Sequence, residues 1–433
     1  MSDQIRILCI SPSFVPLADS EAFCGAKMVK ALTDFGADVR VISANNINGP
    51  GFPLDHSPLW QFTRGLNTNV PVPAEKERFR RLRTTVRYQS LNARWVEAVV
   101  QFARRLHREG RFDLIYSRSW PMVAHAAGYW CSRALGLPWV ANTNDPWDRC
   151  FWPGSEAVHG TMLDRISGSF WLRRTFRHAQ LLMFPSERLA NFHFRLAGRH
   201  PAAVIIPHIG CSPKQDDNGN GAAGGRPLFR LVHAGKLGTT EISGRSARGM
   251  FAGLAGFLAA APEARSAVRL LLAGPGDKQT QLLVEELGLR EQVVHVGQIS
   301  YEESLRCISQ ASVCVLLEAK MDEGMFLPSK LVDYISVRKP ILALSPRIGV
   351  AADMAAVGEL LRVDPDDASA IQAAIAGLYA DFRRGTLHCR APREAFSKQF
   401  GPLAVAGQFM RAVGPLLKSS RRHVGTLGIA AAS

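Results

Sequence analysis

The sequence predicts an α/β protein built from two Rossmann-like domains, because three observations agree. Apolar runs alternate with amphipathic helical stretches along the whole chain, which is the pattern of βαβ units and a parallel sheet. Segments such as 268–274 and 313–318 are apolar almost throughout, as strands covered on both faces must be. A polar, glycine-rich stretch divides the chain of 433 residues, a length sufficient for two domains. Two such domains are expected to face a cleft.

The first half alternates strand and helix signals around one irregular stretch. Strands are expected at 5–11, 38–43, 113–117, 139–142, 179–184 and 203–208. Helices are expected at 22–35, within 75–111, at 121–135 and within 162–177, with a short helix before the last strand. Residues 44–74 are rich in Asn, Gly and Pro and are expected to be irregular.

The domain boundary is predicted at segment 212–226, SPKQDDNGNGAAGGR, which lacks apolar periodicity and is typical of a flexible linker. The expected organisation is a domain at 1–211, a linker at 212–227, a domain at 228–400, and a C-terminal helix and tail at 401–433. Strands of the second half are expected at 229–235, 268–274, 293–297, 313–318, 340–345 and 359–363. The final helical segment, 403–417, is compatible with packing on either domain.

The composition indicates a globular protein with an anionic partner. The apolar fraction is 47%, and the net charge of +15 favours a nucleic acid, a phosphate-bearing ligand or an anionic membrane surface. No helix-turn-helix, RRM or OB pattern is recognisable, so nucleic acid is not expected. The eight cysteines form no CxxC pair or zinc spacing, which favours reduced thiols in a cytoplasmic protein.

The sequence predicts no targeting or membrane-spanning segment. The N-terminal residues lack the layout of a signal peptide. The longest apolar run, 250–262, is too short to cross a bilayer and ends in a proline. Membrane contact, if made, is therefore expected to be peripheral, at the inner face of the membrane.

One candidate phosphate site lies in segment 318–340, EAKMDEGMFLPSKLVDYISVRKP. A strand ends there, a loop with an acidic pair and a glycine follows, and a helix begins at Pro328. Free backbone N–H groups in the first helical turn attract anions, and Lys330 adds a positive charge. This chemistry suits a diphosphate. The alternative interpretation is an ordinary helix start with a surface lysine.

A second candidate phosphate site is HAGKLGTTEISGR, at 233–245, which follows the first strand of the second domain. Gly235 and Gly238 allow the chain to pass close to a ligand. Lys236 and Arg245 are placed to contact phosphates, and Arg suits bidentate contact. The alternative is a loop with two solvated cations.

Together these segments resemble the retaining GT-B glycosyltransferases of family 4, also called glycosyltransferase group 1, over nearly the whole chain. LPSKLVDYISVRKPILAL resembles the family's helix-and-strand signature PSKLxEYLAxGKP and is the most specific match. LLLAGPGD and VVHVGQIS resemble the segments that flank the nucleobase, and EAFCGAKMVKALTDFGADVRVIS resembles the first glycine loop, helix and strand. NDPW resembles a segment at the cleft, and IIPHIG resembles the strand before the interdomain linker.

The resemblance implies a set of functional positions. In the family, a Gly-Arg/Lys pair and a later base grip the donor diphosphate, which here are Gly235-Lys236 and Arg245. The implied catalytic residues are Lys236, Arg245, Glu323, Asn144 and Asp145. The implied substrate-binding residues are Gly25, Gly235, Gly276, Gln298, Ile299, Ser329, Lys330 and Asp333. No metal ligand is implied.

The sequence departs from the family pattern at two places. Many members have two glutamates, the first near the donor sugar and the second on the ribose. Here the second position is Asp333 and the first is Met325, with Glu323 nearby as a substitute. Many members also have a histidine near the reacting carbon, where this chain has Asn144 followed by Asp145.

The resemblance implies a hexosyltransferase that uses a UDP- or GDP-type sugar nucleotide and retains anomeric configuration, without a metal or other cofactor. The N-terminal domain is expected to bind the acceptor, a glycan or lipid-linked glycan in polysaccharide or glycoconjugate biosynthesis. Lys236, Arg245 and the helix start at Ser329-Lys330 would stabilise the departing diphosphate. A sugar-nucleotide 2-epimerase of the same fold, or a non-catalytic descendant that binds a nucleotide or polyanion, remains as an alternative.

Two basic segments are candidates for contact with an anionic membrane or the acceptor. Segment 75–111 interleaves aromatic and basic residues, and so does 170–178, FWLRRTFRH. The alternatives are a solvated basic helix face for the first and a core helix with a basic edge for the second. His125, His208 and His233 are interpreted as structural residues near strand or helix ends, with a cleft-facing role as the alternative for His208.

Overall fold

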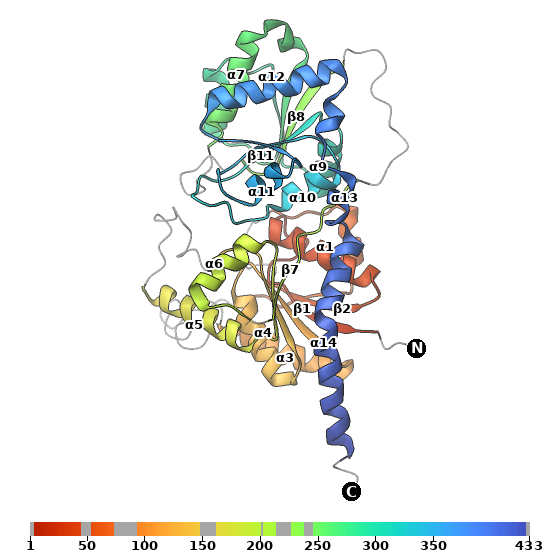
Figure 1. The fold of residues 1–433 in the computed structure, drawn as a ribbon. Helices are drawn as coiled ribbons and strands as arrows, with labels where there is room; N and C mark the ends of the chain where they lie inside the picture. The colour runs from red at the N-terminus through yellow and green to blue at the C-terminus, as the bar shows by residue number, and fades with distance from the viewer. Residues whose placement is uncertain are drawn as a thin grey trace. The chain divides into compact units, whose positions relative to one another are not determined.

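The computed structural model describes residues 4–44, 53–72, 93–147, 162–200, 202–213, 227–237 and 246–429. The chain divides into two compact units. Unit 1 combines Met1–His208 with Pro402–Ser433, and unit 2 is Ile209–Gly401. Figure 1 shows the final helix, in dark blue, beside the red and orange elements of unit 1. The C-terminal helix, which the sequence allowed on either domain, therefore belongs to unit 1.

Unit 1 contains a parallel seven-stranded sheet in the order β3-β2-β1-β4-β5-β6-β7. Its strands are β1 (Arg6–Ile10), β2 (Asp38–Ser43), β3 (Asn67–Asn69), β4 (Leu114–Ser119), β5 (Trp139–Thr143), β6 (Leu181–Phe184) and β7 (Ala203–Ile205). All six strands predicted in this half are present. The sequence missed β3, because its residues are polar and it forms through backbone pairing with β2, where Val41 is opposite Asn67.

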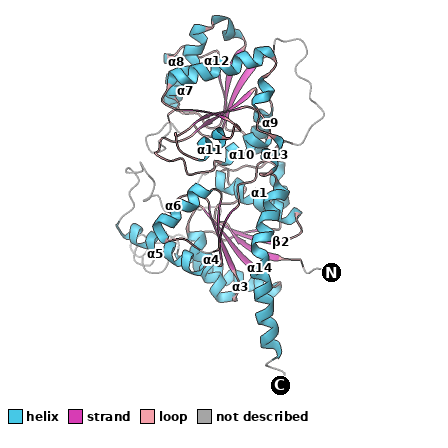
Figure 2. Ribbon diagram, viewed as in Figure 1, coloured by secondary structure: helices cyan, strands magenta, loops and turns pink. Residues whose placement is uncertain are grey.

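The helices of unit 1 cover the faces of this sheet (Figure 2). They are α1 (Ser20–Asp34), the 3-10 helix Pro58–Thr63, α3 (Ala93–Glu109), α4 (Val123–Leu135), α5 (Met162–His178), α6 (Glu187–Ala197) and α14 (Pro402–Ile429). Helix α1 begins where it does because the Asp19 side chain accepts a hydrogen bond from the Ala22 amide at 2.7 Å. The first part of the helix predicted within 75–111 lies outside the described residues.

Helix α14 is longer than the predicted 403–417 and completes the core of unit 1. It packs along α1, and the buried Phe409 ring lies edge-on to Tyr116 of β4 with ring centroids 5.0 Å apart. An edge-on aromatic pair combines apolar burial with a favourable quadrupole arrangement. Within the described part of the chain, none of the helices is both long and apolar enough to cross a membrane.

Unit 2 contains a parallel six-stranded sheet in the order β10-β9-β8-β11-β12-β13. Its strands are β8 (Phe229–Ala234), β9 (Val268–Ala273), β10 (Val293–Gly297), β11 (Val313–Leu317), β12 (Ile341–Leu344) and β13 (Leu361–Val363). Its helices are α7 (Arg248–Ala260), α8 (Lys278–Glu286), α9 (Tyr301–Ser309), α10 (Ser329–Ser336), α11 (Val350–Ala356), α12 (Ala368–Arg384) and α13 (Glu394–Lys398), with 3-10 turns at Pro262–Ser266 and Leu387–Arg390.

Helices α7 and α12 pack closely against each other over the apolar sheet of unit 2 (Figures 1 and 2). Gly253 makes this approach possible, since a Cβ atom there would lie 2.5 Å from Cγ2 of Ile371. In both units every strand pair is parallel, so the loops after the strands gather at one edge of each sheet. Ligands of open α/β sheets bind at that edge, and the predicted site residues follow the strands accordingly.

Candidate functional site

In unit 2, the loops after β8 and β11 bring two predicted residues together. Gly235 follows β8 with φ of 101°, a left-handed conformation that favours glycine. A Cβ atom at Gly235 would lie 3.0 Å from Nζ of Lys330, which belongs to the first turn of α10. The ammonium group of Lys330 is therefore held beside the backbone of the glycine turn.

His233 orients that lysine. Its Nδ1 lies 3.0 Å from the carbonyl oxygen of Val315, which can only accept, so Nδ1 carries the proton and donates. Nε2 is then the unprotonated nitrogen and accepts a hydrogen bond from Nζ of Lys330 at 3.4 Å. His233 is fully buried, and it links β8, β11 and α10 at the candidate phosphate site. The sequence suggested a structural role for this histidine but not this partner.

The glycine turns after β8 and β9 touch each other. The Gly235 amide donates to the carbonyl oxygen of Ala273 at 2.6 Å, and a Cβ atom at Gly274 would lie 2.5 Å from the Gly235 oxygen. Gly276 follows in the same loop, and Gln298 and Ile299 follow the neighbouring strand β10. The residues implied for the nucleobase thus lie at one edge of the sheet, with Gln298 exposed and Ile299 half-buried.

Helix α10 begins with Pro328 at its N-cap, and no side chain caps its first turn. Ser329 and Lys330 are half-buried there. The uncapped first turn leaves the positive end of the helix dipole without a carboxylate of its own. This arrangement suits an anion, and Lys330 lies beside it.

Asp333, on the same helix, is buried and tied to protein groups through both carboxylate oxygens. Its Oδ1 accepts from the Cys211 amide at 2.9 Å, and its Oδ2 accepts from the Tyr301 hydroxyl at 3.0 Å. Each oxygen keeps a second lone pair, so the ribose contact implied by the resemblance remains compatible. The sequence missed Tyr301, which opens α9 behind the Ser300 cap.

The acidic loop after β11 is fastened to the loop after β12. The Gly324 amide donates to Ile348, and the Val350 amide donates to Gly324, both at 2.8 Å. Met325, at the first glutamate position of the family, is buried and apolar and supplies no carboxylate. Glu323 lies two residues before it and is half-buried.

The structure describes only the first part of the predicted cationic loop after β8. Lys236 lies immediately after Gly235 and is exposed. Arg245 and Gly238 lie outside the described residues.

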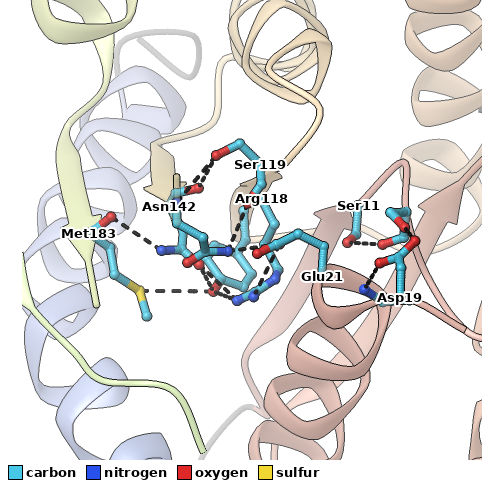
Figure 3. Close-up of polar contacts among 11 residues, drawn as sticks. Ser11, Asp19, Glu21, Arg118, Ser119, Asn142 and Met183 are labelled. Carbon is cyan, nitrogen blue, oxygen red and sulfur yellow. Dashed lines mark hydrogen bonds and ion pairs between the residues drawn. The ribbon is translucent and has the colours of Figure 1, made fainter. Parts of the chain in front are cut away.

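In unit 1, Asn144 follows β5 and is held by two acceptors. Its Nδ2 donates to Oε2 of Glu21 at 2.9 Å and to the carbonyl oxygen of Ser119 at 2.7 Å. Glu21 lies in the first turn of α1, and Arg118 lies at the end of β4 with its Nη2 3.9 Å from the Glu21 carboxylate. Figure 3 shows Glu21 reaching from α1 towards Arg118 and the strand ends.

Arg118 is a buried cation at the centre of this network. Its Nη1 donates to the Tyr116 hydroxyl at 2.7 Å and to Oδ1 of Asn142 at 2.8 Å. Asn142 in turn donates to the carbonyl oxygen of Met183 at 3.2 Å, so the network joins β4, β5 and β6 (Figure 3). The sequence signal was the polar end of β4, SRS after the apolar LIY, which the motif comparison did not use.

Burial dominates the electrostatics of Glu21. Desolvation raises its pKa well above the ordinary value, and the charges of Asp145 and Asp19 raise it further. The Arg118 charge and the hydrogen bond from Asn144 oppose that rise. Asp145, the other predicted catalytic residue of this segment, therefore lies within electrostatic reach of Glu21.

Gly25 lies inside α1 rather than in a loop before it. A Cβ atom there would be 3.2 Å from Oγ of Ser11, 3.3 Å from Phe14 and 3.6 Å from Nε of Arg118. The glycine lets α1 approach the loop after β1 and the arginine. Helix packing therefore accounts for a glycine at this position.

Two other histidines of unit 1 are held neutral. His125 is fully buried between Oγ of Ser117 at 2.9 Å and Oγ1 of Thr143 at 3.3 Å, and burial lowers its pKa to about 3. Desolvation and the charges of Arg118 and Lys27 lower the pKa of His208 to about 3.

Known proteins share both the domains and the fold. Residues 25–208 match the model of the glycosyl transferase 4-like domain, and residues 243–381 match that of glycosyl transferases group 1. No curated protein sequence matches the chain significantly.

Three solved structures illustrate the structural similarity. Sucrose-phosphate synthase of Thermosynechococcus elongatus has a TM-score of 0.67 at 18% identity, covering 96% of this chain and 100% of its own. HepE of Anabaena, solved with UDP and glucose, has a TM-score of 0.65 at 15% identity, covering 95% and 100%. A putative UDP-N-acetylglucosamine 2-epimerase of Listeria monocytogenes has a TM-score of 0.57 at 12% identity, covering 96% and 97%. The fold alone is common to transferases and epimerases, whereas the two domain models are those of transferases. The chain is a group 1 glycosyltransferase with the GT-B fold.

Proposed function

We propose that the protein transfers a hexosyl group from a UDP-sugar to a glycan or lipid-linked glycan, with retention of anomeric configuration. The observation that carries the donor assignment is the position of Lys330, held by His233 at 3.4 Å beside the left-handed Gly235. A fixed cation, a close backbone and a helix start suit a diphosphate. The solved complexes of HepE with UDP and glucose and with UDP-glucose make uracil the first base to test.

In this proposal, the chain acts mainly by stabilising the leaving diphosphate. Lys236, Arg245 and the Ser329-Lys330 turn compensate the negative charge that develops as the glycosidic bond breaks. Groups that are already oriented towards developing charge need no reorganisation during the reaction. A metal ion is not required for this role.

The remaining predicted residues are proposed to hold the rest of the substrates. Gly276, Gln298 and Ile299 flank the base, and Asp333 accepts from the ribose. Glu323 takes the place of the first family glutamate, next to the donor sugar. Asn144 and Asp145 contribute from unit 1, where Gly25 and the acceptor are expected.

The donor proposal is tested by thermal stabilisation and calorimetry with UDP, GDP, ADP, CMP and dTDP. One diphosphate should stabilise the protein, and Lys330→Ala should abolish the shift. The matched control is Lys398→Ala, because that lysine is exposed on α13 of the same unit and should leave the shift intact. No shift with any nucleotide would instead favour a non-catalytic descendant.

Product analysis distinguishes the transferase from an epimerase of the same fold. An epimerase converts the sugar nucleotide without an acceptor, whereas a transferase releases the nucleoside diphosphate as the sugar passes to an acceptor or to water. Chromatography of UDP-sugars incubated with the protein therefore decides between the two. A change of sugar with the nucleotide still attached would overturn the transferase proposal.

A second proposal concerns the location: a cytoplasmic enzyme held at the inner face of an anionic membrane. The supporting observation is an open pocket of about 690 Å³ on α5. Its lining combines apolar and basic residues: Ile166, Ser169, Phe170, Arg173, Arg174, Arg177 and His178. Ile166 and Phe170 are 50% and 39% exposed beside these basic side chains, and a helix surface that combines apolar and basic groups suits an anionic membrane interface.

The membrane proposal is tested by flotation with anionic and with zwitterionic vesicles. Basic residues near an anionic leaflet contribute about 1 kcal/mol each, so binding should require anionic lipid and weaken with salt. The double variant Arg173→Ala, Arg177→Ala should float less than the wild type. The membrane proposal would be wrong if the wild type floated equally with anionic and zwitterionic vesicles, or if it did not float with anionic vesicles at low salt.

A further inference from the structure

The starting point is the pair formed by Glu21 and Asn144 in unit 1. Both hydrogens of the Asn144 amide are used, one on Oε2 of Glu21 at 2.9 Å and one on the Ser119 carbonyl oxygen at 2.7 Å. The opposite orientation of the amide would place its oxygen against two acceptors, so these partners fix which atom is nitrogen. Oδ1 of Asn144 must therefore point away from both.

Two acceptor atoms remain open as a result. Oδ1 of Asn144 and Oε1 of Glu21 have no hydrogen-bond partner among residues that the structure describes. Neither atom is a fully buried, unsatisfied group, and the Glu21 side chain is 13% exposed. Since the Nδ2–Oε2 bond joins the two side chains, the open oxygens belong to one rigid pair.

Arg118 prevents the pair from turning away. It is 3% exposed, its Nη1 is anchored to Tyr116 and Asn142, and its Nη2 lies 3.9 Å from Oε2 of Glu21. The cation attracts the carboxylate without occupying Oε1. The other groups that act on Glu21 are Asp145 and Asp19, which carry the same sign of charge.

We propose that Oδ1 of Asn144 and Oε1 of Glu21 form a subsite for two neighbouring hydroxyl groups of a sugar. Each hydroxyl donates one hydrogen bond to one of the two oxygens. A carboxylate or a fully ionised phosphate does not fit, because it presents only acceptors to two oxygens that need donors. The inference extends the proposed sugar transfer, and the sugar belongs either to the donor or to the acceptor.

Glu21→Gln gives the sharpest test of this chemistry. A glutamine must keep its oxygen towards Asn144, which leaves an NH₂ group, a donor, at the position of the open acceptor. Asn144→Ala removes both the second acceptor, Oδ1, and the hydrogen bond from Nδ2 that holds Glu21. The matched control is Glu187→Gln, since Glu187 is an exposed carboxylate in the first turn of α6 of the same unit.

The primary measurement is saturation-transfer NMR of glucose, galactose and mannose with the full chain, which needs no nucleotide. The wild type should bind at least one of these sugars, and Glu21→Gln and Asn144→Ala should each bind it about tenfold more weakly, as the loss of one hydrogen bond implies. Glu187→Gln should match the wild type. A wild type that binds none of the three, or variants that bind like the wild type, would overturn the subsite.

Calorimetry with UDP and UDP-glucose distinguishes the two sources of the sugar and checks folding. UDP should bind equally to all variants, because its proposed contacts lie in unit 2. If the variants weaken the binding of UDP-glucose as well as that of the free sugar, the subsite belongs to the donor sugar. If they weaken the binding of the free sugar only, it belongs to the acceptor. A wild type that does not bind UDP would contradict the proposed donor. The subsite would then be tested by the free-sugar measurement alone.

Discussion

The residues after the strands differ in chemistry between the two units, although both sheets are parallel. In unit 2, the edge presents the ammonium group of Lys330 beside the turn at Gly235. In unit 1, the corresponding edge presents open oxygens of Glu21 and Asn144. Under our two proposals, the parallel sheets therefore differ in ligand preference, phosphate in unit 2 and hydroxyl groups in unit 1. The difference teaches that the residues after the strands, rather than the sheet, decide what each unit binds.

A buried residue stabilises each of the two edges. In unit 2, the buried His233 accepts a hydrogen bond from Nζ of Lys330 through Nε2. In unit 1, the cation of Arg118 faces the carboxylate of Glu21 at 3.9 Å. Variants in either unit should therefore affect one kind of ligand and spare the other.

The largest expected effect separates the two units by stability. Phe409→Ala removes a fully buried ring from the core of unit 1 and should cost about 3–5 kcal/mol of unfolding free energy there. Calorimetric melting should show one early transition, while UDP still stabilises the later one. The control is Leu403→Ala on the same helix, where the side chain is 64% exposed. A single transition shifted as a whole would show that the units do not unfold separately.

The next effect concerns catalysis. Lys330→Ala should lower kcat/KM by about 10²–10³, the usual result of losing one oriented group that stabilises developing charge. Steady-state release of UDP from the donor measures it. Lys398→Ala should retain full activity. A loss below about threefold would contradict the phosphate assignment of Lys330 and with it the contrast between the units.

A smaller effect is expected from the histidine behind that lysine. His233→Asn keeps a donor for the Val315 carbonyl oxygen but removes the Nε2 acceptor, so Lys330 loses its orientation. UDP should bind about tenfold more weakly, with little change in melting temperature. His233→Ala should lose both stability and affinity. Unchanged UDP affinity in His233→Asn would mean that the histidine has no positioning role.

The last expected effect is a pH dependence located in unit 1. The pKa of His125 is about 3 in the folded protein, below its ordinary 6.5, so the unfolded chain binds more protons between these values. Stability is therefore lost as pH falls through this window, by up to about 1.4 kcal/mol per pH unit. His125→Gln should flatten that slope in urea unfolding between pH 7 and pH 5. An unaltered slope would contradict the neutral state of this side chain.

The sequence predicted the sheets better than it predicted the contacts of the candidate site. Apolar strands such as β9 and β11 are specified by their own residues, whereas the polar β3 depends on pairing with β2. Motifs located Lys330, Asp333 and Asn144, since each lies at a fixed place after a strand.

Their partners could not be predicted, because they come from distant parts of the chain. Glu21 is 123 residues from Asn144, and His233 is 97 residues from Lys330. No local periodicity encodes such a pairing. The buried Arg118 was likewise hidden at the end of an apolar strand.

The return of α14 to unit 1 affects how the protein is made. The ribosome synthesises the first part of unit 1, up to His208, before it synthesises all of Ile209–Gly401. Only then does it reach Pro402, where the second part of unit 1 begins. At about 5–20 residues per second, that interval lasts on the order of 10–40 s. During this time, the surface around Tyr116 and α1 lacks the Phe409 ring that later covers it. Unit 2 can therefore complete its fold first, although the synthesis of unit 1 begins earlier. We expect chaperones to bind nascent unit 1 rather than unit 2.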